Sequence, residues 1–458
     1  MKSIASIAAV AVLAAAVLAG CSATKNCTPP QLNLPAALTA AQADSMSFAD
    51  LEWWKVYTDS ALVDIISETL EYNRDLLVAA ERVRELRELY GVQKLNLTPE
   101  LSANAYADRE TNHYHDAASK NDPETGLKAT LSWEADLWGG LAAARRREGA
   151  RFRASVEQER AIKVTLIAEV ASAYFRLIAL DNELAITRRT LFTREENLNK
   201  ARLRYEGGLT PETVYQQAQV EYATTAALIP GLEHQIEVQQ NAITLLMGRY
   251  PQDELRRSRL VTEQEIPDNL PVGIPSDLLR RRPDLRASEA ALAAALANVG
   301  VAYADRFPRL RISLSGGLEN DGFAGFFSAP FTYVLGSITG TIFDFGKNRR
   351  KHRAAIAAYE QARLAYEQDV LEAFTEVRNA AAGMRYARQT MARRRDLRDA
   401  AKKYAELAFT QYNFGDIAYI DVLDAQRRYF DAQVGLSNAL RDQYLAMTYL
   451  YRVLGGGW

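Results

Sequence analysis

The sequence has few cysteines and almost no net charge, and each shortage excludes a class of protein. Its only cysteines, Cys21 and Cys27, lie near the N-terminus, so the rest of the 458 residues has neither a disulfide framework nor a cysteine-based metal site. The 55 Lys and Arg residues against 57 Asp and Glu give a net charge of −2, which implies no nucleic-acid partner. Because 48% of the residues are apolar and 24% charged, the chain is not disordered throughout.

Long hydrophobic runs are also scarce, and the longest one is N-terminal. Lys2 precedes an apolar and small run from Ile4 to Ala19, which predicts a secretory signal over residues 1–20, because the run is short for a membrane helix. Beyond Cys21 we expect no window long and apolar enough for a membrane helix. If the protein crosses a membrane, it must therefore do so as strands.

The end of the signal resembles the lipobox of bacterial lipoproteins. Leu18-Ala19-Gly20-Cys21 matches it, and the resemblance implies cleavage before Cys21 and acylation of that residue. An unmodified thiol is the alternative. More than one acyl chain gives stable anchoring, so we expect residues 21–60 to be a lipid anchor followed by an extended segment. Cys27 receives no role.

The chain consists of two similar halves related by a constant offset of 207 residues. Upstream the offset becomes 209, which a small length difference near the predicted hairpins explains. We therefore predict a first repeat over 61–250, a proline-bearing linker over 251–275, and a second repeat over 276–458. The matched pairs include Trp138-Gly139 with Phe345-Gly346, Tyr205 with Tyr412, Gly208 with Gly415, and Tyr222 with Tyr429.

Each half carries a heptad pattern that predicts a very long helix. A helix from about Leu141 to Tyr205 would be on the order of 100 Å long at 1.5 Å per residue. Thr210-Pro211 predicts the N-cap and first residue of a partner helix ending near Met247, and Gly415-Asp416 opens one ending near Leu454. These pairs predict antiparallel coiled-coil hairpins. The seam residues are Val170, Ala173, Leu177, Leu180, Leu184, Leu191, Leu198 and Tyr205 in the first half, and Phe374, Val377, Ala381, Met384, Ala387 and Met391 in the second.

A different period, of two residues, lies before each long helix. Apolar residues alternate with polar ones over 127–137, a length that would cross an outer membrane as a tilted strand. Similar alternation over 310–315 and 334–342, with a poorer match over 100–108, predicts four strands in two hairpins, about 100–137 and 309–345. We expect residues 109–126 and 320–330 to link them. The alternative is a small soluble sheet.

Four strands cannot close a membrane barrel, because closed barrels begin at about eight strands and open edges are not tolerated in lipid. If the strands span a membrane, several subunits must therefore share one barrel.

A resemblance to a known family becomes specific in the second half. Ile274-Pro275-Ser276-Asp277-Leu278-Leu279, Arg281-Arg282-Pro283-Asp284-Leu285-Arg286 and Val422-Leu423-Asp424-Ala425-Gln426-Arg427 are similar to stretches of outer-membrane factors of the TolC class, in particular the NodT lipoprotein branch. The resemblance implies a mainly α homotrimer with a shared twelve-stranded β-barrel and a periplasmic helical tunnel. It also implies a periplasmic adaptor and an inner-membrane pump, of the resistance-nodulation-division type, as partners, and no cofactor.

Two carboxylates near the second tip are candidate gate residues. Asp421 and Asp424 are three residues apart and share a helical face, so copies around an axis would gather at one constriction. From spacing alone, they could equally complement the helix dipole and face water. The resemblance favours a ring at the closed periplasmic entrance, with Arg427 and Tyr412 in links between neighbouring helices. The first repeat has no such acids, since Val214 and Gln217 replace them.

Other signals carry less weight. Ile417 stands where some members of the family have an arginine that holds the tip shut, so the hydrogen bonds of the gate are expected to differ here. His113 and His115 lack a third metal ligand, and Gly346-Lys347-Asn348 fails the phosphate-loop pattern. The basic clusters Arg145–Arg147 and Arg349–Arg353 suggest a rim near the strands, touching lipid phosphates or lining the lumen, or else a solvated face. No enzyme motif is found.

The leading functional hypothesis is a passive exit duct of a tripartite efflux system in the outer membrane. The exit duct of a type I protein secretion system has the same architecture and is the first alternative. A lipid-anchored coiled-coil scaffold without a pore is the second, although such a scaffold has no use for lipid-facing strands.

Overall fold

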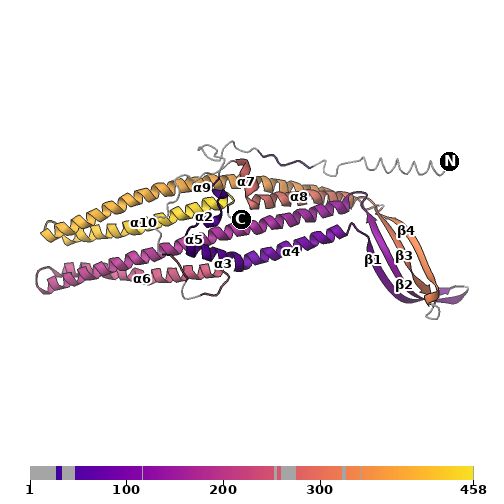
Figure 1. Cartoon of the computed structure of the whole chain (residues 1–458), viewed down its shortest axis with the longest axis horizontal. Helices are drawn as coiled ribbons and strands as arrows, with labels where there is room; N and C mark the ends of the chain where they lie inside the picture. The colour runs from indigo at the N-terminus through magenta and orange to yellow at the C-terminus, as the bar shows by residue number, and fades with distance from the viewer. Residues whose placement is uncertain are drawn as a thin grey trace. The chain divides into compact units, whose positions relative to one another are not determined.

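A computed structural model describes residues 27–32, 47–115, 117–251, 255–258, 275–321, 326–341 and 343–456 (Figure 1). The predicted signal, Cys21 and most of the linker 251–275 lie outside these residues. The chain divides into two compact units. The sheet unit comprises Met1–Leu32, Arg82–Val156 and Ala287–Gln368, and the hairpin unit comprises Asn33–Glu81, Glu157–Arg286 and Asp369–Trp458.

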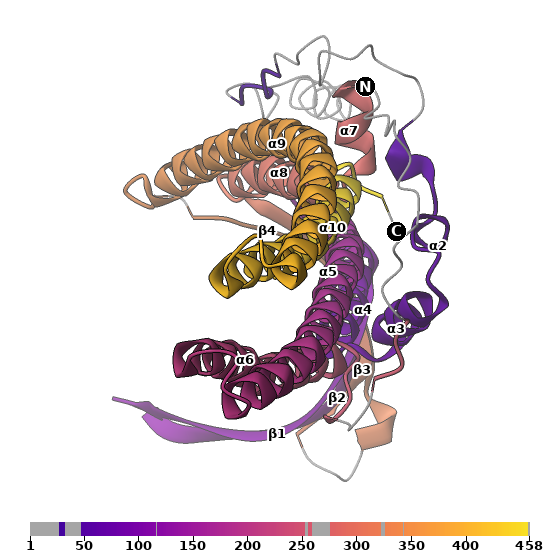
Figure 2. The same ribbon diagram turned by 90° about the vertical axis from the view of Figure 1, so that its left-hand side faces the viewer.

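Long helices account for most of the fold, as the heptad pattern predicts. α5 runs over Gly140–Glu206 and α9 over Lys347–Phe414, with 67 and 68 residues. Their partners α6 (Glu212–Leu246) and α10 (Tyr419–Val453) have 35 residues each and lie beside them (Figures 1 and 2). Shorter helices include α3 (Ser60–Tyr72), α4 (Arg74–Leu95), α7 (Pro275–Arg281) and α8 (Pro283–Ala304).

The two hairpin turns have the same construction at the 207-residue offset. Gly208 and Gly415 have φ values of +72° and +82°, where an L side chain would be strained. In the first turn the Leu209 N–H donates to Arg204 O over 2.8 Å, and in the second the Asp416 N–H donates to Gln411 O over 2.9 Å. One prediction is wrong by a residue. Pro211 is the N-cap of α6 and not its first helical residue, since its ψ of 155° is extended.

The predicted heptad seams are buried only in part. In α5, Val170, Ala173, Leu177 and Leu184 are buried, whereas the seam positions from Leu191 onward are half-buried or exposed. In α9 the seam residues Val377 and Met384 are buried, and the other four are half-buried. A single chain therefore leaves the seams incomplete toward the tips.

The four strands form one antiparallel sheet in the order β1-β2-β3-β4. They are β1 (Glu100–Tyr114), β2 (Ala117–Ala135), β3 (Arg309–Asn320) and β4 (Pro330–Thr339), the last two flanking a short 3₁₀ turn at Phe326–Ser328. The prediction of four strands in two hairpins is confirmed.

The predicted link over residues 109–126 is wrong, because most of it is strand. Arg109 pairs with Pro123 and Thr111 with Asn121 in the β1–β2 ladder. Alternating hydrophobicity marks a strand with one apolar face, whereas this part of the hairpin is polar on both faces and gives no such signal. Ile342, which the pattern placed in the last strand, lies outside the described residues.

The sheet exposes its apolar face and partly covers its polar face. Leu101, Leu131, Leu314 and Val334 are direct neighbours across the four strands. Leu131 is 40% and Val334 72% exposed. On the other face, Thr130 Oγ1 and Ser315 Oγ lie 2.9 Å apart, in a hydrogen bond between β2 and β3. A soluble sheet buries its apolar face, so this arrangement argues against the soluble alternative.

Two further expectations need correction. Residues 47–59 are extended only in part, because a 3₁₀ turn at Phe48–Asp50 and α2 (Trp53–Val56) interrupt them, held by buried aromatic contacts such as Phe48 on Tyr451 at 5.4 Å. Among the described helices, α8 is long and apolar enough to span a membrane by length and composition alone. Its apolarity comes from alanines, which suit close packing: a Cβ added at Gly300 would lie 3.1 Å from Ala143 of α5.

The N-terminal strap, residues 27–32, is fixed to α9 in the sheet unit. The Gln31 N–H donates to Glu367 Oε1 over 2.9 Å, and the Tyr359 hydroxyl donates to Thr28 O over 2.7 Å. Arg363, one turn earlier on α9, orients the Glu367 carboxylate by donating from Nη1 to Oε1 over 2.6 Å. The strap is therefore held by one face of α9.

Candidate gate at the helical tips

The four predicted gate residues all lie around the turn between α9 and α10. Tyr412 is in the last turn of α9, while Asp421, Asp424 and Arg427 occupy the first turns of α10. Asp421 and Arg427 are exposed, and Asp424 and Tyr412 are half-buried. Figure 2 shows this hairpin and the α5–α6 hairpin of the same unit.

The carboxylate of Asp421 caps its own helix. Its Oδ2 accepts a hydrogen bond from the Ala418 N–H over 3.1 Å. Ala418, the N-cap, has no side-chain acceptor of its own, so Asp421 is the acid that complements the positive end of α10. In the single chain Asp421 therefore complements the helix dipole, which is one of the two roles that the sequence spacing allowed.

Asp424 forms an exposed ion pair on the same helix. Arg428 Nε donates to Asp424 Oδ2 over 2.7 Å, at an i,i+4 spacing. The bond raises the pKa of the Arg428 guanidinium. Such a solvent-exposed pair stabilises a helix only weakly.

Arg427 reaches across to the other hairpin. Its Nε donates to Glu221 Oε1 of α6 over 2.7 Å, and its Nη2 lies 2.5 Å from the same oxygen. The Glu221 side chain is only 8% exposed, whereas that of Arg427 is 48% exposed. This contact joins α10 to α6, the shorter helices of the two hairpins.

Glu221 also binds a second arginine, which is buried. Arg194 Nη1 of α5 lies 3.0 Å from Glu221 Oε2, donates to the Glu221 backbone carbonyl over 2.9 Å, and bonds Thr225 Oγ1. Its guanidinium also lies 5.9 Å from the ring centre of Phe430 on α10. One carboxylate thus serves two arginines from two different helices.

The electrostatics of this cluster follow from burial. Desolvation lowers the pKa of the Arg194 guanidinium, and the negative charge of Glu221 opposes that effect. The hydrogen bond to Glu221 raises the pKa of Arg427, against a smaller effect of desolvation. Burial, with the neighbouring Tyr412, also raises the pKa of Tyr419 to about 12. Burial and the shared carboxylate therefore act on the two arginines in opposite directions.

Tyr412 contacts the first hairpin through its ring. The guanidinium of Arg204, in the last turn of α5, lies 5.7 Å from the Tyr412 ring centre, and the Tyr419 ring lies 5.4 Å from it. A cation over an aromatic face is stabilised by the ring quadrupole. Ile417, in the turn before α10, is half-buried and supplies no charged group there.

Sequence reasoning identified Arg427 and missed Glu221, Arg194 and Arg204. The 207-residue offset aligns Glu221 with Arg428, an exchange of charge sign between the repeats. That exchange was a usable signal that Glu221 has a role specific to one hairpin. Arg194 aligns with Ala401 and gives a weaker signal of the same kind.

The two histidines considered as metal ligands, His113 and His115, belong to the β1–β2 hairpin and not to the helical tips. Within the part of the chain that the structure describes, no three His, Cys, Asp or Glu residues are grouped to hold a metal ion. His115 is exposed in the β1–β2 turn, and the side chain of His113 lies outside the described residues.

Comparison with known proteins gives consistent matches over nearly the whole chain. The family described as outer membrane efflux protein matches residues 65–249 and again 274–456. The pyoverdine export outer membrane protein OpmQ of Pseudomonas putida is 30% identical over 446 residues, covering 94% of each chain. The solvent efflux pump outer membrane protein SrpC of Pseudomonas putida is 30% identical over 457 residues, covering 96% of each chain. The solved structure of the outer-membrane channel OprN superimposes with a TM-score of 0.86 at 30% identity, covering 94% of this chain and 99% of that one.

Proposed function

Because the chain belongs to the outer membrane efflux protein family, we propose that its α9–α10 tip is the gate of an efflux channel. The protein is the outer-membrane exit duct of a tripartite efflux system and acts as a homotrimer with a periplasmic adaptor and an inner-membrane pump. Three chains contribute four strands each to one barrel, which continues into a helical periplasmic tunnel. The relatives are channel proteins and not enzymes.

The outward apolar face of the sheet is the observation that carries the pore. Paired apolar residues face outward across all four strands. The other face is polar on β1, β2 and β3, and β4 adds Tyr333 and Leu335 to it. Such a sheet needs lipid on one side and water on the other. A scaffold without a pore has no use for this arrangement.

Substrates are proposed to be small molecules that cross passively. OpmQ is named for pyoverdine export and SrpC for solvent efflux, two chemically different cargoes carried by channels about equally similar to this chain. Selectivity is therefore assigned to the pump, which we take to be of the resistance-nodulation-division type. Because the pump selects the substrate and the channel only conducts it, one channel can export several different drugs.

The gate is proposed to close through two sets of contacts. Asp421 and Asp424 of three chains would gather at the axis, where like charges attract cations and resist a fully ionised ring. Arg427 and Tyr412 hold the α9–α10 hairpin against Glu221 and Arg204 of the first hairpin. Opening requires these inter-hairpin contacts to part, whereas Arg194 keeps Glu221 paired within the first hairpin.

The strap supports the proposal that Cys21 is the lipid anchor. Thr28 lies seven positions after Cys21, and an extended chain spans at most about 3.5 Å per position, so roughly 25 Å are available. Tyr359, which binds Thr28, lies twelve residues into α9, or about 18 Å along the helix. The anchor can therefore reach the end of α9 that adjoins the sheet.

Single-channel conductance in a planar bilayer tests the gate. Asp421→Ala with Asp424→Ala removes both carboxylates, so we expect a larger resting conductance and weaker block by divalent cations. An unchanged conductance trace would contradict the proposal.

A second double variant separates charge from helix capping. Asp421→Asn with Asp424→Asn removes the same charge but leaves an oxygen that can accept the Ala418 N–H bond. The proposal requires it to conduct like the alanine variant. If only the alanine variant shows a larger conductance, loss of the helix cap and not loss of charge is responsible. The proposal that a ring of carboxylates forms the gate would then be wrong.

A further inference from the structure

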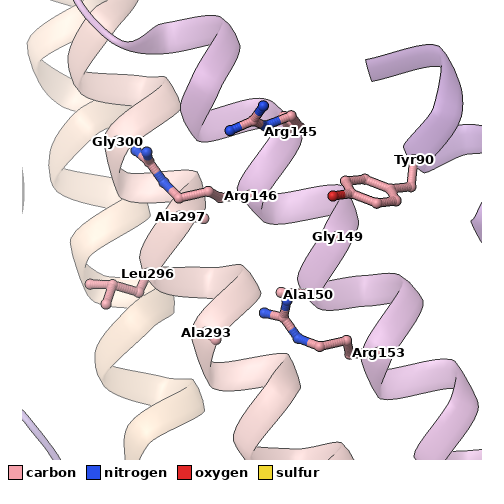
Figure 3. Close-up of a pocket in the computed structure, with 10 residues that line it drawn as sticks. All are labelled: Tyr90, Arg145, Arg146, Gly149, Ala150, Arg153, Ala293, Leu296, Ala297 and Gly300. Atoms are coloured by element: carbon pink, nitrogen blue, oxygen red, sulfur yellow. The ribbon is translucent and has the colours of Figure 1, made fainter. Parts of the chain in front are cut away.

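A hollow lined by arginines lies at the start of α5 in the sheet unit. It has a volume of about 580 Å³ between α5, α8 and Tyr90 of α4. Arg145, Arg146 and Arg153 extend from α5 into the space beside α8 (Figure 3). This hollow is separate from the tips, and the channel function assigns it no role.

The three arginines differ from their neighbours in having no anionic partner. Arg147 donates to Glu148 over 2.8 Å and to Asn298 over 2.9 Å, and Arg151 lies 3.0 Å from Glu148. For Arg145, Arg146 and Arg153, no carboxylate lies within ion-pair distance anywhere in the described ranges. Three exposed guanidiniums thus share one hollow with their charge uncompensated.

The acids at the start of these helices are already engaged by the backbone. Asp136 accepts the Leu141 N–H over 3.0 Å and the Ala142 N–H over 2.8 Å, so it complements the positive end of α5. Asp344 accepts the Gly346 and Asn348 N–H groups in the same way before α9, whose first turns carry the second basic cluster, Arg349–Arg353. Among the described residues, neither carboxylate pairs with Arg145, Arg146 or Arg153.

The floor of the hollow is built from small and apolar side chains. Ala150 of α5 faces Ala293, Ala297 and Leu296 of α8. This leaves room for more than an inorganic ion, and gives a ligand apolar surface beside the guanidiniums. A phosphate attached to an apolar body matches both features, because guanidinium groups bind phosphate oxygens bidentately.

The hollow lies where lipid headgroups are expected. Trp138, between β2 and α5, stacks on Phe307 at 4.6 Å and donates to Pro308 O over 2.7 Å, and such aromatic residues mark a membrane interface. Arg145 follows the start of α5 by five residues, or about 8 Å, and Arg153 by thirteen, or about 20 Å. Helical side chains lean toward the N-terminus, so all three lean toward the sheet.

We propose that this hollow binds the phosphate group of an anionic phospholipid from the periplasmic leaflet of the outer membrane. The three arginines bind the phosphate, and the alanine floor contacts the glycerol and the first carbons of the lipid. Because the site lies on α5 directly after β2, a bound lipid would fix the joint between strand and helix.

Binding to the purified full-length trimer in maltoside detergent tests the proposal. The probes are dihexanoyl-phosphatidylglycerol, inorganic phosphate and dihexanoylglycerol, which lacks phosphate, each measured by titration calorimetry. We expect the phospholipid to bind and dihexanoylglycerol not to bind. Equal binding of dihexanoylglycerol overturns the phosphate contact, and inorganic phosphate binding as tightly as the lipid overturns the lipid as the source.

Matched variants locate the site. Arg145→Gln, Arg146→Gln and Arg153→Gln together should weaken phosphatidylglycerol binding at least tenfold. Arg202→Gln, Arg393→Gln and Arg395→Gln remove the same charge from exposed positions elsewhere and should change it less than twofold. Equal losses in the two triple variants would show a general charge effect and overturn the site.

A variant that keeps every charge guards against misfolding of the triple variant. Ala293→Phe fills the floor of the hollow at an exposed position of α8 and should also weaken lipid binding at least tenfold, with the trimer intact on a gel. Unchanged lipid affinity in Ala293→Phe would place the ligand outside the hollow.

Discussion

At the scale of single residues, Glu221 is the centre of the inter-hairpin contact. It is buried, pairs with buried Arg194 in its own hairpin, and accepts Arg427 from the other. Removing one partner of a buried ion pair is far more costly than removing an exposed partner, because a charge is left without compensation. The two arginines should therefore have separable roles.

Arg427→Ala and Glu221→Gln should both raise resting conductance, but only the second should strongly lower thermal stability. Arg427→Ala leaves Glu221 paired with Arg194 and should cost at most about 1 kcal/mol. Glu221→Gln leaves Arg194 buried and unpaired, which costs about 3 kcal/mol. Conductance recordings and the melting temperature of the trimer in detergent measure the two effects.

Arg188→Ala is the control for this comparison. It removes an exposed partner of Glu233 that also joins α5 to α6, over 2.7 Å, but lies within one hairpin. Its conductance should equal that of the unmodified protein. Wild-type conductance in Arg427→Ala and in Glu221→Gln would show that this contact does not hold the gate.

At the scale of elements, the tip turns depend on glycines in a left-handed conformation. Gly415 has a φ of +82°, and nothing lies within 4 Å of where its Cβ would be. A side chain at this position is therefore strained by the backbone and not by crowding. The second tip joins the two helices that the gate proposal requires to move.

Gly415→Ala should loosen the α9–α10 tip by about 1–2 kcal/mol. Hydrogen exchange followed by mass spectrometry should show faster exchange in peptides covering 408–424, because the last turn of α9 and the cap of α10 open more often. Gly383→Ala is the matched control: this exposed mid-helix glycine of α9 has open space for a Cβ, and alanine there should stabilise the helix by about 0.5–1 kcal/mol. Equal exchange in both variants would contradict the role of Gly415.

How far the sequence predicts these elements depends on how local the signal is. Heptads and alternation are local, so α5 was predicted from about Leu141 to Tyr205 and found from Gly140 to Glu206, and the number of strands was right. The outer part of the first hairpin was missed because its residues are polar on both faces. Glu221 was missed because its pairing with Arg427 joins residues 206 apart in sequence. Contacts of this range are set by packing.

At the scale of the whole molecule, the sheet has an apolar outer face and two unpaired edges. β1 and β4 each have a strand on one side only among the described residues. Unpaired strand edges are not tolerated in lipid. Each edge must therefore be paired with a strand of a neighbouring chain.

Val334→Lys should prevent assembly of the trimer, measured as loss of a heat-modifiable species on a gel. Val334 lies midway along β4, opposite Leu314 on the outer face, and a lysine near the bilayer midplane costs about 2–4 kcal/mol. Ser132→Lys adds the same charge on the polar face, opposite Ser313, and should assemble normally. If the serine variant fails and the valine variant assembles, the two faces of the sheet are reversed.

The unpaired edges also have a genetic consequence. A chain with a disrupted β1 or β4 still has one intact edge strand that can pair with a neighbouring chain. It is therefore incorporated into the trimer and leaves one pair of strands in the barrel unpaired. If normal and broken chains are made in equal amounts and combine at random, only about one trimer in eight is free of a broken chain. A strand-edge allele should therefore be dominant over the normal copy, whereas a null allele should be recessive.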